Sequence, residues 1–299
     1  MNGILNIDKP YGITSMDVIR DIRHATNMSK VGHGGTLDPL ASGVVPVAIG
    51  NSTRLLEYIL SNNKKYLAEI TLGISTNTYD CEGTTTKESD PSNISKCDIE
   101  KTLTFFKGDI LQTPPMYSAI KSKGEPLYKL ARKGITIERA PRAVTVESIS
   151  LHSYNNPIMK IEINCTKGFY VRSLANDIGE SLGCGAHLSN LRRTASGSFS
   201  INDSIELNTA TKNIVNGKIN DILLDPTNYL DNIEKIFLSE SESAAIQNGK
   251  KIALSSKHIS KNTKLACAYN SNKIFIAMLI ADDKSKEWKP QKVFSNWLV

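Results

Sequence analysis

The chain has 299 residues, and 40% of them are hydrophobic, which is enough to bury one large core or a core with a small second domain. Its net charge is +6 and its sequence pI is about 8.9, values that suit a polyanionic partner but are shared by many enzymes. No run approaches the ~18 apolar residues of a membrane helix, and the first residues lack the pattern of a signal peptide. Composition therefore argues against a membrane or secreted protein and predicts a cytoplasmic one.

The cysteines and histidines argue against a disulfide framework and against a metal site. There are five cysteines, an odd number, and no two of them have CxxC spacing. The five histidines are scattered along the chain without the spacing of metal ligands. We therefore expect no bound metal.

The first quarter of the chain alternates short strands and short helices. Residues 66–72 alternate apolar and polar side chains, the pattern of a strand with one face in water. The predicted elements are, in chain order, a strand over 4–7, a helix capped by Thr14 or Ser15, a glycine-rich loop over 31–43, an apolar stretch over 44–49, a short helix over 55–60, and the strand over 66–72.

The later elements favour an α+β protein over a doubly wound sheet, because strands outnumber helices and neighbouring strands read as antiparallel. Composition shifts near 225–232, and a tail of about 70 residues follows that reads as a small β-rich domain. The elements predicted after residue 80 are a surface loop over 84–98, strands over 144–151 and 158–165 joined by a turn at 155–157, a helix over 171–182 and a strand over 274–280.

Positive charge is concentrated in the segment 118–142. This segment holds seven basic and two acidic residues, and its net +5 nearly equals the excess of the whole chain. A basic segment of this density can contact several phosphates at once. Charge alone leaves a solvated loop as an equally good interpretation.

The motif GHGGTLDP, residues 32–39, holds the first candidate for chemistry. Three glycines in four positions allow the backbone to approach a ligand closely or to adopt positive φ. Pro39 biases Asp38 toward an extended conformation, so this carboxylate is held at a defined angle on an irregular loop. The residues alone also fit a structural Asp-Pro turn beside a surface histidine, His33, which is the commoner outcome for such a pattern.

The stretch GHGGTLDPLASGVVPVAIG resembles the signature of the TruB family of bacterial tRNA pseudouridine-55 synthases. The family pattern is roughly G-H-x-G-x-L-D-P-x-A-x-G-x-L-P, and this chain departs from it at Val45, where leucine is usual. Further blocks match the family in chain order and span most of residues 1–195. They are GILNIDKPYGITS (3–15), KKYLAEITLG (64–73), TNTYDCEG (76–83), TPPMYSAIK (113–121) and CTKGFYVRSLANDIGESLGCGAHLSNLRR (165–193).

The resemblance implies a pseudouridine synthase fold. This fold has a central mixed, largely antiparallel sheet flanked by helices and loops, plus a small C-terminal β-rich PUA-like domain. We expect the catalytic domain over 1–230 and the PUA-like RNA-binding domain over 231–299. The basic segment 118–142 then corresponds to a thumb-like insertion that clamps RNA.

The resemblance also assigns site residues. It makes Asp38 the catalytic carboxylate, with Arg172 pairing with it and Tyr66 stacking on the target base. Tyr66 is also a candidate carrier of the proton that leaves C5, directly or through water. The other residues that the resemblance places in substrate binding are His33, which fills the space left by the flipped nucleotide, and Tyr170 and Leu191, which line the uridine pocket. The residues expected at the RNA backbone are Lys9, Lys121, Lys129, Arg132, Lys133 and Arg142.

The implied activity is isomerisation of the uridine at position 55, in the T-loop of tRNA, to pseudouridine. The C1′–N1 bond is exchanged for a C1′–C5 bond and nothing is oxidised, so no cofactor is expected. The target base must be flipped out of the folded loop. We expect the T-arm of tRNA as the partner, a monomer and no obligate protein partner. Two alternatives stay open, a non-catalytic RNA-binding or RNA-folding protein and a guide-RNA-dependent, dyskerin-like synthase.

Overall fold

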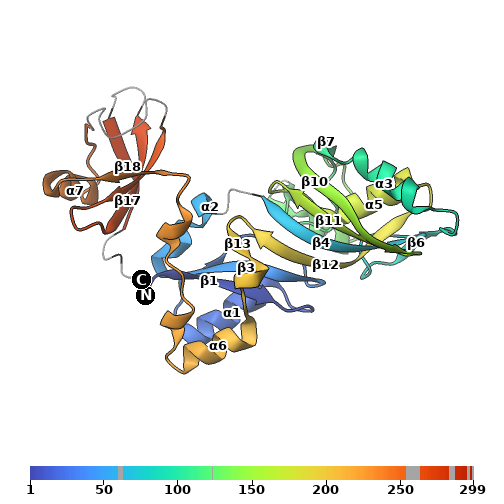
Figure 1. The fold of residues 1–299 in the computed structure, drawn as a ribbon, viewed down its shortest axis with the longest axis horizontal. Coiled ribbons are helices and arrows are strands. Elements are labelled where there is room, and N and C mark those ends of the chain that lie inside the picture. The colour runs from blue at the N-terminus through green and yellow to red at the C-terminus, as the bar shows by residue number, and fades with distance from the viewer. Residues whose placement is uncertain (60–62, 123, 254–262, 283–286, 295–296, 298–299) are drawn as a thin grey trace.

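The structure is a computed structural model that describes residues 1–59, 63–122, 124–253, 263–282, 287–294 and 297. Its centre is a ten-stranded sheet (Figure 1). The strands of this large sheet are β1 (Gly3–Lys9), β2 (Val31–His33), β3 (Ala41–Ile49), β4 (Lys64–Leu72), β7 (Gly108–Gln112), β10 (Arg142–Asn155), β11 (Ile158–Cys165), β12 (Ala186–Ser196), β13 (Phe199–Ser200) and β14 (Ile205–Glu206).

The large sheet is mixed and largely antiparallel, as the sequence predicted. Its main path runs β14-β1-β3-β12-β4-β11-β10-β7, while β2 pairs with β3 and β13 pairs with β12. The pairs β1–β14 and β3–β12 are parallel, and the other pairs are antiparallel. The turn expected at 155–157 joins β10 to β11, and the alternating strand expected over 66–72 forms most of β4.

Four helices supply the core of the large sheet: α1 (Ser15–Thr26), α3 (Lys96–Thr104), α5 (Val171–Ser181) and α6 (Leu207–Val215). Their apolar faces share one buried cluster with alternate residues of β1, β3, β4 and β11. The N-cap of α1 is Thr14, not Ser15. The Thr14 hydroxyl accepts from the Asp17 N–H and the Asp17 carboxylate accepts from the Thr14 N–H, which forms a capping box.

The loop expected over 84–98 contains a strand and the start of a helix. A second capping box, between Ser95 and Asp98, begins α3 there, and the polar composition of the segment had hidden this signal. The remaining short elements are α2 (Leu56–Ile59), α4 (Leu127–Arg132), the hairpin β5 (Ile74–Thr76) and β6 (Thr85–Glu88), the pair β8 (Lys121–Ser122) and β9 (Glu125–Pro126), and the 3₁₀ turns η1 (Gly50–Arg54), η2 (Ile201–Asp203), η3 (Ile219–Asp221) and η4 (Pro226–Tyr229).

The tail forms a second sheet of four strands at one end of the molecule (Figure 1). This is the β-rich unit that the sequence predicted. Its apolar core includes residues of the sheet and of the helix that packs on it. The elements of the tail, in the order of the sheet and then the helix, are β15 (Glu234–Phe237), β16 (Leu265–Tyr269), β17 (Phe275–Asp282), β18 (Glu287–Val293) and α7 (Glu240–Gln247).

The two sheets share a buried cluster at their junction. Ile4 of β1 belongs to the same cluster as Phe275 of β17 and Trp297. Arg54 also links them, because its Nη1 donates to the Val293 carbonyl at 2.7 Å. The four-stranded sheet of the tail is therefore packed onto the part of the chain that forms the large sheet.

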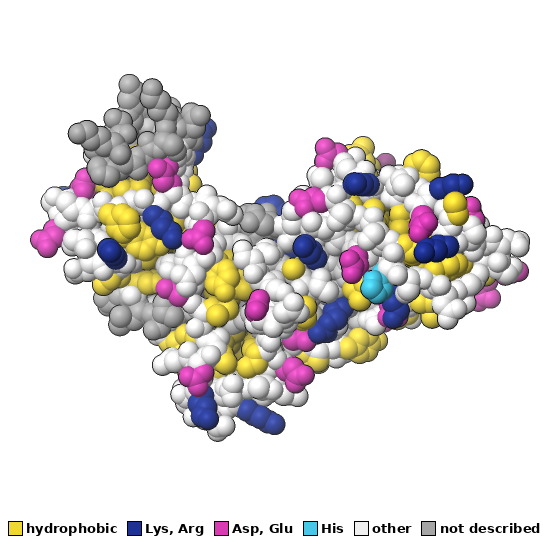
Figure 2. Space-filling model, viewed as in Figure 1, with side chains coloured by type: hydrophobic (Ala, Val, Ile, Leu, Met, Phe, Trp, Pro, Cys, Tyr) yellow, Lys and Arg dark blue, Asp and Glu magenta, His cyan; other side chains and the backbone are white. Residues whose placement is uncertain are grey.

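The surface offers little guidance to function from the side drawn in Figure 2. Cations, anions and apolar side chains are interspersed over the large sheet on that face, without a continuous basic area. Within the described part of the chain, no helix is long and apolar enough to cross a membrane.

The shared junction gives a stability prediction. Phe275 is 1% exposed, and its ring centre lies 5.1 to 5.7 Å from those of Tyr269, Phe294 and Trp297. We expect Phe275→Ala to lower the free energy of unfolding by roughly 3–5 kcal/mol, because it leaves a cavity at the centre of the cluster. Urea unfolding should shift equally by tryptophan fluorescence, which reports on the tail, and by far-UV circular dichroism. Phe237→Ala, at an exposed ring, is the control, and two separate transitions in the variant would contradict a shared core.

Candidate active site

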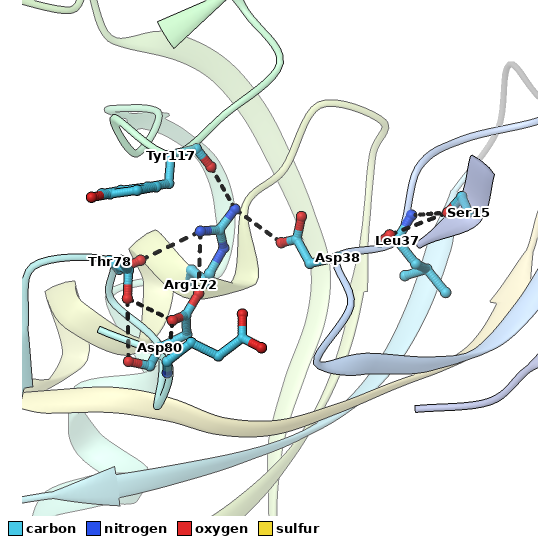
Figure 3. Close-up of polar contacts among 8 residues, drawn as sticks. Ser15, Leu37, Asp38, Thr78, Asp80, Tyr117 and Arg172 are labelled. Atoms are coloured by element: carbon cyan, nitrogen blue, oxygen red, sulfur yellow. Dashed lines mark hydrogen bonds and ion pairs between the residues drawn. The ribbon is translucent and has the colours of Figure 1, made fainter. Parts of the chain in front are cut away.

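Asp38 lies on a loop between β2 and β3 that is anchored on both sides of the carboxylate. The Ser15 hydroxyl accepts from the Leu37 N–H at 2.8 Å and donates to the Leu37 carbonyl at 3.1 Å (Figure 3). The Gly12 N–H donates to the Pro39 carbonyl at 2.8 Å. The loop is irregular in conformation but fixed in place, so the Asp38 carboxylate has a defined position.

A buried guanidinium joins Asp38 to a second carboxylate. Nη2 of Arg172 lies 2.9 Å from Oδ2 of Asp38, and Nη1 lies 3.2 Å from Oδ2 of Asp80 (Figure 3). The side chains of Arg172 and Asp80 are 8% and 5% exposed, whereas that of Asp38 is 41% exposed. Asp38, Arg172 and Asp80 therefore form a triad. Arg172 and Asp80 are buried, and Asp38 is exposed enough to contact a ligand.

Further hydrogen bonds hold the two buried members of this triad, Arg172 and Asp80. Nη2 of Arg172 donates to the Tyr117 carbonyl at 2.7 Å, and Nη1 donates to the Thr78 carbonyl at 3.4 Å. Oδ1 of Asp80 accepts from the Thr78 hydroxyl at 2.5 Å and from the Glu82 N–H at 3.1 Å. A planar guanidinium held on several sides cannot rotate freely, so it fixes the direction of the Asp38 carboxylate.

Asp80 is a residue that the sequence argument did not assign. It belongs to the block TNTYDCEG, where one aspartate among polar residues carries no sign of burial. Its partner Arg172 lies 92 positions away, so only the folded chain reveals the pair. With Asp80 present, the Arg172 charge is balanced inside the protein even when Asp38 is engaged with a ligand.

Asp38 faces a cavity of about 310 Å³, at the lower end of the range for ligand pockets. The residues predicted for uridine binding, Tyr66, Tyr170 and Leu191, line the same cavity. Arg172 lines it as well. The structure therefore brings together five of the six assigned catalytic and substrate residues.

Tyr66 is held by an arginine that the sequence argument did not assign. Tyr66 on β4 stands opposite Arg193 on β12, and the Arg193 guanidinium is in hydrogen-bonding contact with the Tyr66 hydroxyl. Burial raises the pKa of Tyr66, and the Arg193 charge only partly opposes this rise. Tyr66 is therefore neutral at physiological pH, where it can donate a hydrogen bond but cannot act as a base without first losing its own proton.

Tyr170 is held through its backbone by a buried glutamine. Oε1 of Gln112 accepts from the Tyr170 N–H at 2.7 Å, and Nε2 donates to the Tyr170 carbonyl at 3.0 Å. Burial raises the pKa of Tyr170, while the neighbouring Ser118 side chain opposes this rise. Because Ser118 opens the basic segment 118–142, Tyr170 connects that segment to the wall of the cavity.

Two lysines near the site are buried, and one of them, Lys9, was expected at the RNA backbone. Lys9 is 0% exposed, and its ammonium donates to the carbonyls of Pro10 and Ile13 at 2.9 and 2.7 Å. The structure thus contradicts the prediction that Lys9 contacts the RNA backbone, because its charge is used inside the protein. Lys64, which was not assigned, is 7% exposed and lines the cavity. Burial lowers the pKa of each lysine to about 8.

His33 is the last residue of β2, immediately before the loop that carries Asp38, and does not line the cavity. Burial lowers the pKa of His33, as does the Arg193 charge, while a hydrogen bond with the Gly35 backbone opposes the change. The imidazole is therefore neutral at physiological pH. A neutral, partly exposed ring beside the cavity suits stacking on a base.

The segment 118–142 folds as β8, β9 and α4 next to the cavity, which its first residues line. Lys133 pairs with Glu125 at 2.8 Å, and the Arg132 guanidinium lies 5.6 Å from the centre of the Tyr128 ring. Lys123 lies outside the described residues. The five remaining residues expected at the RNA backbone are exposed: Lys121, Lys129, Arg132, Lys133 and Arg142.

Comparison with known proteins agrees with this geometry. A family model described as TruB family pseudouridylate synthase (N terminal domain) matches residues 23–171, and one described as tRNA pseudouridylate synthase B C-terminal domain matches residues 172–232. A tRNA pseudouridine synthase B from Dehalococcoides mccartyi is 44% identical over 98% of this chain and 97% of its own length. The chain belongs to the TruB family. A protein of the same name from Clostridium tetani is 44% identical over 84% of this chain and 86% of its own.

Solved structures confirm the fold of this TruB family member. A protein in the crystal structure of a Cbf5-Nop10-Gar1 complex superposes with a TM-score of 0.73 at 26% identity, over 98% of this chain and 84% of that one. A chain of an H/ACA RNP bound to a substrate RNA containing 2′-deoxyuridine gives a TM-score of 0.72 at 24% identity, over 98% and 85%. The predicted pseudouridine synthase fold is thereby confirmed.

The buried half of the triad gives a second prediction. Asp80→Asn keeps the shape of the side chain but leaves the Arg172 charge with one ionic partner. We expect the free energy of unfolding to fall by roughly 3 kcal/mol, because one member of a buried ion pair is removed. Urea unfolding measures this, with Asp90→Asn as the control, since Asp90 only closes an exposed turn with Ser92. Equal stability of Asp80→Asn and wild type would contradict the balancing role.

Proposed function

We propose that this protein isomerises one uridine in the T-loop of tRNA, position 55, to pseudouridine, with Asp38 as the catalytic carboxylate. The observation that carries the proposal is the ion pair between Arg172 and Asp38 at a cavity lined by Tyr66, Tyr170 and Leu191. Membership of the TruB family and relatives named tRNA pseudouridine synthase B support the reaction and the class of RNA.

The reaction requires a carboxylate in a fixed direction and room for a base to turn. When the C1′–N1 bond breaks, its electron pair leaves with the uracil ring, and C1′ becomes electron-deficient. Oδ2 of Asp38 is held by Arg172, while Oδ1 takes no part in that ion pair and can act toward the sugar or the base. After the ring rotates, C5 bonds to C1′, the C5 proton leaves, and N1 gains a proton.

The aromatic residues of the cavity serve binding in this proposal. Tyr66 packs on the flipped base as a neutral phenol, and Tyr170 and Leu191 close the pocket around it. His33, beside the cavity, fills the gap that the flipped nucleotide leaves in the RNA. Flipping costs a few kcal/mol, which such stacking offsets in part.

RNA outside the pocket is held by charge in this proposal. The thumb-like insertion 118–142 contacts phosphates through its exposed lysines and arginines. The catalytic domain spans 1–230 and a PUA-like RNA-binding domain spans 231–299. We propose a monomer that acts on the T-arm without a protein partner. The structural neighbour comes from a complex with partner proteins, so dependence on partners or guide RNA is the alternative that an experiment has to separate.

Asp38→Asn tests the catalytic assignment. Purified protein is incubated with an unmodified T-arm stem-loop, and pseudouridine is mapped by chemical probing. We expect wild type to modify the T-loop uridine and Asp38→Asn to be slower by about 10³-fold or more, the order seen when a central catalytic group is removed. Asp21→Asn, at an exposed position on α1, is the matched control and should keep full activity.

Each other outcome of this experiment has a defined meaning. Full activity of Asp38→Asn would remove Asp38 from the mechanism. Activity of wild type only after addition of a guide RNA would favour the dyskerin-like alternative. RNA binding without any pseudouridine would favour a non-catalytic RNA-binding protein.

The thumb assignment gives a separate prediction about salt. Replacing Lys129, Arg132 and Lys133 by glutamine should weaken T-arm binding, and the slope of log K against log salt should flatten by about 0.7–0.9 for each phosphate that the protein no longer neutralises. Filter binding over a salt series measures both effects. A matched triple glutamine variant on α3 and its following turn (Lys96, Lys101 and Lys107) removes the same charge elsewhere. An unchanged slope in the thumb variant would remove the clamp role.

A further inference from the structure

Arg193 is a buried guanidinium that the mechanism above does not use. It is 1% exposed, and among the residues that the structure describes no carboxylate forms an ion pair with it. Burial lowers the pKa of Arg193, which reflects the cost of keeping its charge away from water. A buried charge without an ionic partner persists only when hydrogen bonds offset that cost.

The hydrogen bonds of Arg193 join three parts of the cavity wall. Nε donates to the Val44 carbonyl of β3 at 2.7 Å, and Nη2 donates to the Gly35 carbonyl of the catalytic loop at 3.2 Å. The third part of the wall is β4, where Tyr66 stands opposite Arg193 and its hydroxyl contacts the guanidinium. Gly35 lies three residues before Asp38, so one side chain links the catalytic loop to Tyr66.

The register of the large sheet places the guanidinium at this point. Lys9, Gly43, Arg193 and Tyr66 are successive partners across β1, β3, β12 and β4. Gly43 has a φ of 106°, and a Cβ there would lie 2.2 Å from the Arg193 carbonyl oxygen. Glycine at 43 therefore permits the close approach of β3 and β12 that sets Arg193 beside the catalytic loop.

We infer that Arg193 is a positioning residue for the isomerisation, which holds Tyr66 and the catalytic loop in one geometry through the Tyr66 hydroxyl and the Gly35 carbonyl. The inference rests on the proposed function. Tyr66 lines the cavity that Asp38 faces and stands opposite Arg193 across the pair β12–β4. The guanidinium thus restrains the position of Tyr66 relative to the loop that carries Asp38.

Arginine suits this role better than lysine. Its planar fork presents donors in several fixed directions, whereas an ammonium is a compact charge on a flexible stem. The three acceptors of Arg193 lie on three different segments, so a lysine at 193 cannot reach all of them at once. We therefore expect Arg193→Lys to keep the charge but recover only part of the function.

A double-mutant cycle tests the inference. The variants are Arg193→Met, Tyr66→Phe and the double variant, each assayed for the single-turnover rate constant on the T-arm stem-loop and for RNA affinity. We expect Arg193→Met to lower the rate constant by roughly 100-fold, the cost of a small misplacement of reacting groups. The affinity for the T-arm stem-loop should change little. The double variant should be no slower than Arg193→Met, because either substitution alone already removes the contact between Arg193 and Tyr66.

The neighbouring Arg192 provides the control. It lies on the same strand, its side chain is 41% exposed, and its Nη2 pairs with Asp8 at 2.7 Å. Arg192→Met makes the same chemical change outside the cavity and should retain the wild-type rate constant. A similar loss in Arg192→Met would mean that the effect at 193 is a general weakening of β12 and would overturn the inference.

The remaining outcomes are also decisive. If the rate losses of Arg193→Met and Tyr66→Phe multiply in the double variant, the two residues act independently and the inference fails. If Arg193→Met does not fold, the same cycle is run with Arg193→Lys. If wild type makes no pseudouridine, the proposed function fails on its own. The contact between Arg193 and Tyr66 is then tested by the free energies of urea unfolding of the same three variants. Additive losses in the double variant would refute the contact.

Discussion

The ion pair between Arg172 and Asp38 is the interaction on which the rest of the site depends. A carboxylate that is 41% exposed would turn freely in water, but a guanidinium that is 8% exposed holds one of its oxygens at 2.9 Å. A buried guanidinium needs counter-charge on the protein side as well, because Asp38 is open to the cavity and to any ligand there. Asp80 supplies this counter-charge, since it keeps Arg172 paired and oriented whatever state Asp38 is in.

The large sheet brings these groups together from distant parts of the chain. The parallel pair β3–β12 places the strand that follows the catalytic loop beside residues 191–193, and β4 joins on the other side of β12. Asp38 itself stands on a loop, where a ligand can reach it, but hydrogen bonds of the neighbouring Leu37 and Pro39 with Ser15 and Gly12 hold that loop in place. The Asp38 carboxylate lies on a loop, but its position is as well defined as that of the sheet to which the loop is bonded.

Features that depend on neighbouring residues were predicted from the sequence. Features that depend on contacts between distant residues were not. The motif around Asp38, the strand holding Tyr66 and the helix that starts after Tyr170 are all encoded by neighbouring residues. The role of Asp80 depends on a partner 92 positions away, and that of Arg193 depends on the register of four strands. Lys9 shows the opposite error, because the resemblance placed its ammonium at the RNA backbone, whereas the ammonium donates to the carbonyls of Pro10 and Ile13 inside the protein.

The segment expected to clamp RNA begins at residues that also shape the active site. The Tyr117 carbonyl accepts from Arg172 at 2.7 Å, and Ser118 lies beside the Tyr170 side chain. The stretch of backbone that opens the basic segment therefore also helps to hold Arg172, whose guanidinium orients the Asp38 carboxylate.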